Sequence, residues 1–589
     1  MVAKELDYIR SKDNADGSSL EKNGGVYIDA FDAQDNGPKL KGFAKWVDDF
    51  KRVDDSHLGI DPNLSETEKL AIKTANAPLA RKLKNRHLQM IAIGGSIGTG
   101  LFVGSGGAMR NGGPAGVLIA YFLIGTMMYT TVQSLGELAI TFPVSGAFVT
   151  YNSRFIDPSW GFAMAWNYAM QWLVVFPLEM VAGAIVVQYW NKDINSAAFV
   201  AIFWTGIVAI NFFGVKGYGE AEFVFSIIKV VAVIAFIFLG IILAAGGGPN
   251  HEYIGGRYYQ HPGAFAHGFK GVCVNFVSAA FAFAGTELVG LAAAETKDPR
   301  KSLPSATKQV FWRITLFYII SLCLVGLLVP YTDPQLVGTS SYDANASPFV
   351  IAIEDAGIKG LPSVMNAVIL IAVLSVGNSS VYGSSRTLAA LAASGQAPKI
   401  LGYIDKTGRP LVAIIVQCVF GLIAFITASD KSGDVFDWLL ALSGLSSIFT
   451  WGSINFCHIR FRRALAVQGR TTDEIAFVSQ VGVWGAAYGL GLNILVLIAQ
   501  FWVALFPLGG SPNASDFFMA YLAVPVVILF YVGHKLWTKN WKLYFRASEI
   551  DIDTGRRELD LDLLKQEIAE ERAYIASKPL YYRLYHFFC

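Results

Sequence analysis

The sequence predicts an all-α membrane protein with about twelve transmembrane helices. Hydrophobic residues make up 53% of its 589 residues and charged residues only 16%, and the mean hydropathy is +0.43. A soluble domain would not bury so large an apolar fraction in one core. The apolar residues also fall into runs of about 20, the length of helix that crosses a bilayer. Together these observations indicate a polytopic membrane protein.

The order of the apolar runs defines the expected organisation of the chain. Residues 1–86 and 538–589 are polar tails, and the first is expected to be mostly disordered because it has no apolar run of membrane length. Five spans are expected within 87–247, five more within 248–460, and two additional spans within 461–537. The expected spans are 88–109, 115–140, 161–189, 197–215, 221–246, 270–294, 310–331, 361–391, 411–428, 436–457, 481–506 and 516–537.

Basic residues in the connecting loops predict the orientation of the chain. An even number of spans places both tails on one side, and the loops on that side hold fifteen Lys and Arg residues against six in the other loops. Because cytoplasmic loops carry an excess of Lys and Arg, both tails are expected to be cytoplasmic. The first twenty residues are polar and charged, so no cleavable signal peptide is expected.

Composition and spacing disfavour several other classes of protein. The net charge is +2 and Lys and Arg occur in scattered clusters, so nucleic acid is not an expected partner. The five cysteines have no CxxC spacing, and no metal or other cofactor is expected. The spans contain neither the catalytic constellation of an enzyme nor the filter loops of a channel. The sequence therefore predicts a protein that is not an enzyme.

Glycine recurs through the first span in a way that disfavours an unbroken helix. The stretch is IAIGGSIGTGLFVGSGG, residues 91–107. Close packing against another helix is one interpretation, because several of these glycines are four residues apart. A nucleotide-binding loop is excluded because Val103 stands where its third glycine would be. The third interpretation is a discontinuous helix whose freed backbone groups bind a ligand.

The sixth span contains a matching interruption. Its stretch FAFAGTELVG, residues 281–290, places small residues and a carboxylate in the middle of an apolar run. Spans one and six are the first helices of the two sets of five, and paired broken helices are typical of transporters built from inverted repeats. A half-helix N-terminus holds an anion, whereas freed carbonyls hold a cation. The two interruptions therefore favour a small zwitterion with a carboxylate and an ammonium group.

Several stretches resemble the fungal amino-acid permeases of the amino acid-polyamine-organocation superfamily, and among them the general amino-acid permeases. They are GGSIGTGLFVGSG (94–106), GELAITFPVSGAF (136–148), FGVKGYGEAEFVFSIIKV (213–230), FAFAGTELVGLAAAETKDPRKSLP (281–304), VGNSSVYGSSRTLAALA (376–392), LSGLSSIFTW (442–451) and DIDTGRRELDLDLLKQEIAEE (551–571). The resemblance extends from about residue 61 to residue 589, and only the N-terminal residues before it depart from the pattern.

The resemblance implies a fold and an activity. The fold is LeuT-like, with a five-plus-five inverted repeat, broken helices one and six, and two additional helices. The activity is proton-coupled uptake of amino acids with broad specificity, by alternating access across the plasma membrane. The alternatives are a permease of narrower specificity and a transporter that also acts as a nutrient sensor.

The resemblance also implies a set of substrate contacts near the two interruptions. The backbone N–H groups of Thr99 and Gly100 would hold the substrate carboxylate, and the Thr99 hydroxyl would assist. Freed carbonyls would accept the ammonium group, and the Phe281 ring would close over the substrate. The expected contacts at the interruptions are Ser96, Gly98, Thr99, Gly100, Phe281, Ala284 and Gly285.

Four ionisable residues inside the spans are functional candidates, because charge within a bilayer is costly. Glu137 lies near the cytoplasmic end of span two, where a structural role is expected. Glu179 in span three either lines the side-chain pocket or makes a helix–helix hydrogen bond. Lys229 in span five is expected to carry the proton, since the resemblance places it where relatives bind sodium. Glu287 either titrates during transport or braces the half-helix after the interruption.

Small polar residues on spans eight and ten are expected to border the substrate side chain. They are Ser375, Asn378, Ser446 and Thr450. Taken singly, each such residue more often makes a helix–helix hydrogen bond than a substrate contact.

The tails contain candidate regulatory residues. Lys4, Lys12 and Lys22 are candidates for ubiquitin by resemblance, so a ubiquitin ligase and the endocytic machinery are candidate partners. Leu563 and Leu564 lie on one side of a short amphipathic helix expected in the C-terminal tail. Cys589 is either a palmitoylation site or a plain thiol near the membrane.

Overall fold

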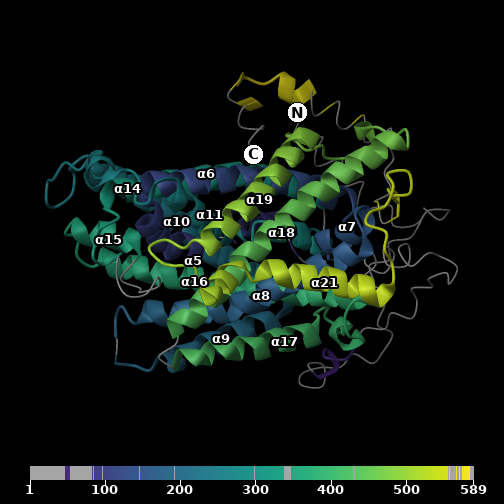
Figure 1. The fold of residues 1–589 in the computed structure, drawn as a ribbon, viewed down its shortest axis with the longest axis horizontal. Coiled ribbons are helices and arrows are strands. Elements are labelled where there is room, and N and C mark those ends of the chain that lie inside the picture. Colours follow the sequence, from purple (N-terminus) through teal and green to yellow (C-terminus); the bar gives the residue numbers. More distant parts are fainter. Residues whose placement is uncertain are drawn as a thin grey trace, which may run out of the picture. The chain divides into compact units, whose positions relative to one another are not determined.

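A computed structural model gives the fold of the chain and contains mainly helices (Figure 1). It describes residues 47–52, 83, 85–95, 97–144, 146–191, 193–296, 299–336, 347–428 and 432–554, together with residues 556, 566, 570, 573–580, 582 and 583. Within these residues the only β-type pairings are isolated bridges, such as the one between Arg52 and Asp405. The described part of the chain is therefore all-α, as the sequence predicts.

Each of the twelve expected spans has a helical counterpart. Eight helices are individually long and apolar enough to cross a membrane, and the pair α20 and α21, bent by 66°, makes a ninth. Two shorter apolar helices correspond to spans four and nine, and the first span is divided into pieces. The spans are α4 (Asn85–Gly94) with α5 (Thr99–Phe102), α6 (Gly104–Thr141), α8 (Pro158–Val187), α9 (Ser196–Phe212), α10 (Gly214–Ala244), α11 (Gly268–Phe283) with α12 (Leu288–Ala292), α13 (Pro299–Trp312) with η3 (Arg313–Ile320) and α14 (Ser321–Leu328), α16 (Leu361–Ala393), α17 (Leu411–Gly421) with η6 (Leu422–Ala428), α18 (Ser432–Val467), α19 (Gly482–Leu505), and α20 (Ala514–Tyr521) with α21 (Ala523–Thr538).

The end of span one and all of span two form one hydrogen-bonded helix, α6. The expected boundary is a kink within it, where Gly113 has φ 70° and ψ 173° and Pro114 follows. The positive φ suits glycine, and proline removes one backbone donor, so these two residues bend the chain without a loop. Short helices outside the spans include α7 (Phe148–Phe155) and α15 (Pro348–Asp355).

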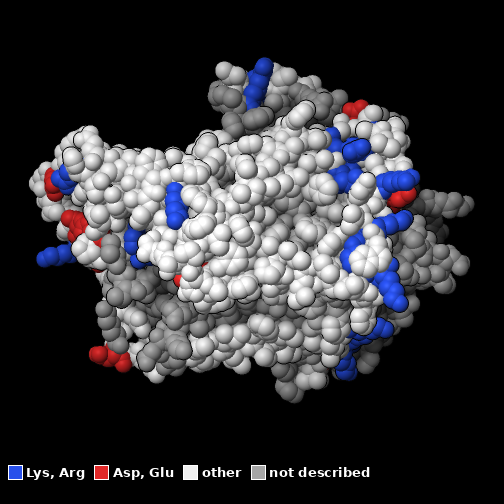
Figure 2. Space-filling view, viewed as in Figure 1, with Lys and Arg blue, Asp and Glu red and all other residues white. Residues whose placement is uncertain are grey.

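The helices divide into an inner group and a lipid-facing group. We compared the 18 most apolar consecutive residues of each span. Of these residues, 83% are buried in α8 and 89% in the α11–α12 span, but only 33% in α10 and 33% in α19. Figure 2 shows a broad face with few charged side chains over α18, α19 and α21. Lys and Arg gather at the end where α7 and the last turns of α21 lie. We call this end of the bundle, where α4 also begins, the tail side.

Parts of both tails pack against the tail side. Tyr403 donates to the carbonyl of Phe50 at 2.8 Å, and Lys406 forms a 2.6 Å ion pair with Asp48. After α21, the backbone N–H of Phe545 donates to the carbonyl of Ile156 at 3.1 Å. Further along, Gln468 donates to the carbonyls of Ala547 and Ile550, and Arg154 pairs with Asp551 at 3.3 Å. The tail segments around residues 48–50 and 545–551 are therefore held to the loops between the spans.

Candidate substrate and coupling site

The first span is interrupted where its glycines recur. Helix α4 ends at Gly94 and α5 begins at Thr99 after the extended residue Gly98. The N–H groups of Leu101 and Phe102 both donate to the Gly98 carbonyl at 3.1 Å. The N–H groups of Thr99 and Gly100 therefore precede the first donors of the helix, at its positive end. Ser96, the remaining contact expected here, lies outside the described residues.

The sixth span is interrupted between α11 and α12. The chain turns over residues 284–287, and Gly285 has φ 95°, which favours glycine. The N–H of Ala284 still donates to Ala280 at 3.0 Å and to Phe281 at 3.2 Å. The Thr286 hydroxyl and backbone N–H both donate to the Phe283 carbonyl. This turn satisfies several of the carbonyls at the end of α11 with its own donors.

The two interruptions lie against each other. A Cβ atom on Gly100 would overlap Ala282 in α11 and would lie 2.8 Å from its backbone nitrogen. A Cβ atom on Gly98 would overlap the Val376 side chain of α16. Tyr121 donates to the carbonyl of Gly100 at 3.3 Å. Close packing and helix interruption are therefore both features of the first span, and they concern the same glycines.

Glu179 of α8 faces the interruption in span one. The Thr99 hydroxyl donates to Glu179 Oε2, so the hydroxyl that was expected to assist the substrate is engaged by a carboxylate. The Glu179 side chain is fully buried. Its Oε1 atom has no hydrogen-bond partner among the described residues. A buried carboxylate oxygen without a donor is costly unless a proton or a ligand satisfies it.

Glu287 braces the interruption in span six. Its carboxylate accepts from the backbone N–H of Gly285 at 3.2 Å, from the Tyr168 hydroxyl at 3.3 Å and from the Trp451 indole at 3.3 Å. These donors come from the turn itself, from α8 and from α18. The adjacent Thr286 accepts from the buried guanidinium of Arg313. Among the described groups, the carboxylate is thus bound on both oxygens.

Lys229 belongs to a buried cluster of three residues. Its Nζ atom donates to Ser375 Oγ at 2.7 Å and lies 3.3 Å from Glu222 Oε1. The Ser375 hydroxyl in turn lies 2.8 and 2.7 Å from the two oxygens of Glu222. Ser226, between the two charged residues, lies 3.2 Å from Glu222 and 3.1 Å from the carbonyl of Met90 in α4. The cluster joins α10 to α16, and Ser226 connects it to the first half of span one.

Glu222 is the member of this cluster that sequence reasoning missed. It lies near the tail-side start of α10, within the glycine-rich part of the span. A signal was available, because Glu222 precedes Lys229 by two helical turns, which places both on one face. Only the fold adds Ser375 from α16. This serine, which we expected to border the substrate side chain, is directed toward the charged pair of α10.

The other expected residues make helix–helix or intrahelical hydrogen bonds. Asn378 accepts from Asn211 of α9 at 2.9 Å. The Thr450 hydroxyl lies 3.2 Å from the Ser446 carbonyl in its own helix, and that carbonyl also accepts from Asn167 of α8 at 3.0 Å.

Glu137 is held at the tail side. Arg462 binds both of its oxygens at 2.6 and 2.8 Å, and the N–H of Ser479 adds a third donor at 2.7 Å. This bidentate arrangement is the structural role expected for Glu137.

The two sides of the interruptions differ in access. On the tail side, Arg386 and Glu295 form a buried 2.9 Å ion pair, and the rings of Tyr218 and Tyr382 stack 4.2 Å apart. On the opposite side, Phe281 lines a small cavity that also includes Arg110 and other residues from the end of span one and from spans six and ten. A buried ion pair and a ring stack therefore lie on the tail side of the interruptions, and the cavity lined by Phe281 lies on the opposite side.

Some expected residues cannot be placed. Lys4, Lys12, Lys22, Leu563, Leu564 and Cys589 lie outside the described residues. Among the residues that are described, no group of three or more His, Cys, Asp and Glu side chains is arranged to hold a metal ion.

Comparison with known proteins gives a family and several similar proteins. Residues 87–546 match the family model described as amino acid permease. The chain is 73% identical over 590 residues to the general amino-acid permease GAP2 of Candida albicans, covering 100% of both chains. It is 62% identical to the general amino-acid permease GAP1 of Saccharomyces cerevisiae, covering 93% of this chain and 92% of that one. A solved mutant of the manganese transporter of Eremococcus coleocola is 13% identical with a TM-score of 0.46, covering 82% of this chain and 96% of that one.

Proposed function

Because the chain belongs to the amino acid permease family, and is therefore a transporter of amino acids and not an enzyme, we propose that it takes up many kinds of amino acid together with protons. The observation that carries the proposal is the meeting of two interrupted helices, where Gly100 packs against Ala282. Interrupted helices at this depth are tolerated where their backbone lines a site. Breadth is further supported by the names of the two relatives, both of which are general amino-acid permeases.

The substrate's main-chain groups bind to the backbone of the two interruptions. The N–H groups of Thr99 and Gly100, at the positive end of α5, hold the carboxylate. The carbonyls of Ser96, Phe281 and Ala284 accept the ammonium group, and the Phe281 ring closes over the substrate. Every amino acid carries these two groups, so this part of the site does not distinguish one amino acid from another. Selectivity among amino acids depends on the side-chain pocket, which Thr450 and Ser446 border.

The proton is carried by the cluster around Lys229. Its three members are fully buried and lie between α10 and α16, so a change of charge there alters how these two helices attract each other. The groups that bear on Lys229 are Glu222 on its own helix, Glu179 on α8 and Arg313 on span seven. Glu179 is the alternative carrier, because one of its oxygens lacks a partner among the described residues.

The protein acts at the plasma membrane with both tails in the cytoplasm. The basic residues at the tail side support this orientation (Figure 2). The first ten spans form two sets of five, within 87–247 and 248–460, and the last two spans within 461–537 are an addition. In the N-terminal tail, ubiquitin ligases attach ubiquitin to Lys4, Lys12 and Lys22. In the C-terminal tail, endocytic sorting depends on Leu563 and Leu564, and the candidate for palmitoylation is Cys589.

Uptake in cells that lack their own permeases tests the proposal. Radiolabelled glutamate, arginine and leucine should all accumulate above the external concentration, and acidifying the medium should raise the accumulation. Uptake of one chemical class alone would establish the narrower permease. If the amino acids only equilibrate across the membrane and do not accumulate, transport is not coupled to protons. If they bind but are not taken up, the protein is a sensor and not a transporter.

A further inference from the structure

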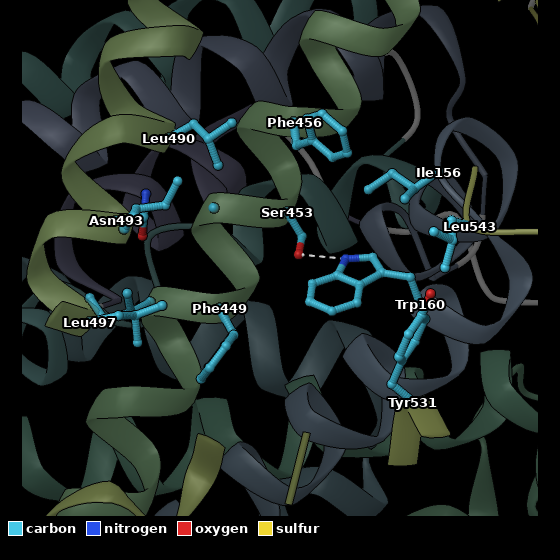
Figure 3. A pocket seen from close by; sticks show the side chains of 13 residues that line it. Ile156, Trp160, Phe449, Ser453, Phe456, Leu490, Asn493, Leu497, Tyr531 and Leu543 are labelled. Carbon is cyan, nitrogen blue, oxygen red and sulfur yellow. Dashed lines mark hydrogen bonds between the residues drawn. The ribbon is translucent and has the colours of Figure 1, made fainter. Parts of the chain in front are cut away.

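A second pocket lies away from the helix interruptions, on the lipid-facing side of the bundle (Figure 3). Its volume is about 330 Å³, within the range of sites for organic ligands. It is bounded by α18, α19, α21 and the start of α8, and none of the proposed substrate or coupling residues lines it.

The walls of the pocket are apolar and fixed in place. The Trp160 indole donates to Ser453 at 3.0 Å and meets the Tyr531 ring edge to face at 5.7 Å (Figure 3). At Gly452 of α18 a Cβ atom would lie 3.4 Å from Asn493 Cβ of α19, which is an ordinary contact distance, so the two helices pack closely along this wall. On the outer wall, Ile494 is 50% exposed. The pocket is therefore a preformed slot beside the surface that faces lipid.

One end of the slot lies at the water interface of the membrane. Leu543 closes this end and follows the last turn of α21. Around it, Trp537 is 87% exposed, Trp541 65% and Tyr544 60%. Exposed Trp and Tyr side chains at helix ends mark the headgroup region of a bilayer. The slot thus extends from the tail-side headgroup region toward the middle of the membrane.

Basic residues lie on the two segments that form this end. Arg460 and Arg463 follow the lining residue Phe456 by one and two turns of α18, on the same face. Lys542 directly precedes Leu543, and both Lys542 and Arg463 are exposed. Figure 2 shows Lys and Arg gathered over the tail-side ends of α18 and α21, where acidic side chains are few. Basic pockets between transmembrane helices at this depth suit anionic headgroups.

We propose that the slot binds one acyl chain of an anionic phospholipid of the tail-side leaflet, with its phosphate against Lys542 and Arg463. The apolar walls accept the chain, and the basic end selects the headgroup. The lipid contacts α8, α18, α19 and α21 at once, and therefore braces the last two spans against the helices that carry Trp160 and Trp451. Binding of the lipid does not depend on the substrate or on the coupling ion.

Native mass spectrometry of the purified full-length protein tests the site. Delipidated protein is titrated with palmitoyl-oleoyl phosphatidylserine and, in parallel, with the phosphatidylcholine of the same chains. We expect one phosphatidylserine to bind in preference to phosphatidylcholine. Lys542→Gln should weaken phosphatidylserine binding about fivefold, as expected for one charge near a headgroup, and leave phosphatidylcholine unchanged.

Filling the slot gives a second test with a matched control. Leu497→Phe adds volume inside the pocket, whereas Leu495→Phe adds it on the same helix at a side chain that is 60% exposed and does not line the pocket. Binding should be lost in the first variant and kept in the second. In the same way, Lys359→Gln at an exposed position in the loop before α16 is the control for Lys542→Gln.

Three results would overturn the proposal. They are equal binding of both phospholipids, unchanged phosphatidylserine binding in both Leu497→Phe and Lys542→Gln, and displacement of the phospholipid by ergosterol in equal number. The last result would assign the slot to a sterol, whose hydroxyl has an acceptor available in Asn493 Oδ1.

Discussion

The two interrupted helices meet at Gly100 and Ala282, yet the carboxylates beside the two interruptions differ in how many hydrogen bonds they accept. Beside span six, Glu287 accepts donors from Gly285, Tyr168 and Trp451. Beside span one, Glu179 accepts only the Thr99 hydroxyl among the described groups, and its other oxygen has no partner there. One carboxylate is satisfied by the protein, whereas the other has capacity left for a proton or a ligand.

This difference shows that burial alone does not identify a charged residue that takes part in transport. Glu179, Glu287, Glu222 and Lys229 are all fully buried. They differ in how many fixed donors surround them and in whether those donors belong to one helix or to several. A carboxylate whose two oxygens are both bound by fixed donors stabilises the turn that it braces, whereas a carboxylate with an unbound oxygen can still accept a proton or a ligand.

The largest expected effect tests the contact between the interruptions. Gly100→Ala should abolish uptake of every substrate, because the new methyl group would overlap the backbone of Ala282. Gly107→Ala in the same span is the matched control, since a Cβ atom there meets nothing within 4 Å, and it should transport normally. Radiolabelled uptake normalised to surface protein measures both. Normal transport by Gly100→Ala would show that the interruptions do not meet in the working protein.

The next effect concerns the cluster around Lys229. Glu222→Gln and Lys229→Met should each abolish uphill accumulation and its dependence on external acid, while exchange of substrate persists. Each single variant leaves one buried charge without its partner, which costs about 3–5 kcal/mol.

The double variant Glu222→Gln with Lys229→Met separates coupling from stability. It removes both charges, so the melting temperature should recover relative to Glu222→Gln while accumulation stays lost. If accumulation recovers together with stability, the pair is structural and another group carries the proton.

A smaller effect is expected at the satisfied carboxylate. Glu287→Gln preserves shape, so uptake should fall several-fold through weaker hydrogen bonds, with the accumulation ratio and its pH dependence kept. Glu179→Gln is the comparison at the other interruption, and it should alter the pH profile. If Glu287→Gln uncouples transport from protons and Glu179→Gln does not, the roles assigned to the two carboxylates are wrong.

The smallest effect separates the side-chain pocket from the coupling cluster. Thr450→Ala should change uptake of leucine and glycine unequally by a few-fold, because we propose that this residue borders the substrate side chain. Ser375→Ala should lower uptake of all substrates alike, because its hydroxyl bridges Lys229 and Glu222. Competition assays with both amino acids give the ratio. If Ser375→Ala instead changes the uptake of the two amino acids unequally, Ser375 borders the substrate side chain after all.

Several features of the site could be predicted from local sequence. Glycine-rich and polar interruptions in apolar runs predicted the breaks at residues 95–98 and 284–287, because glycine and buried polar groups weaken a helix wherever they occur. The cost of charge in a bilayer singled out Glu179, Lys229 and Glu287. The contacts of these residues were not predictable in the same way. Thr99 and Glu179 are 80 residues apart, and Ser375 is 146 residues from Lys229.

The sequence by itself determined the number and order of the spans, the interruption of spans one and six, and membership of the chain in a family of transporters. These properties depend on the length and local composition of each run. The tertiary structure alone decided that Glu222 and Ser375 join Lys229, and that Glu287 is satisfied while Glu179 is not. The physical reason is that lipid is as apolar as the protein core, so helices such as α8 and α16 do not have one apolar face opposite a polar one. Their sequences do not show which face meets which neighbour.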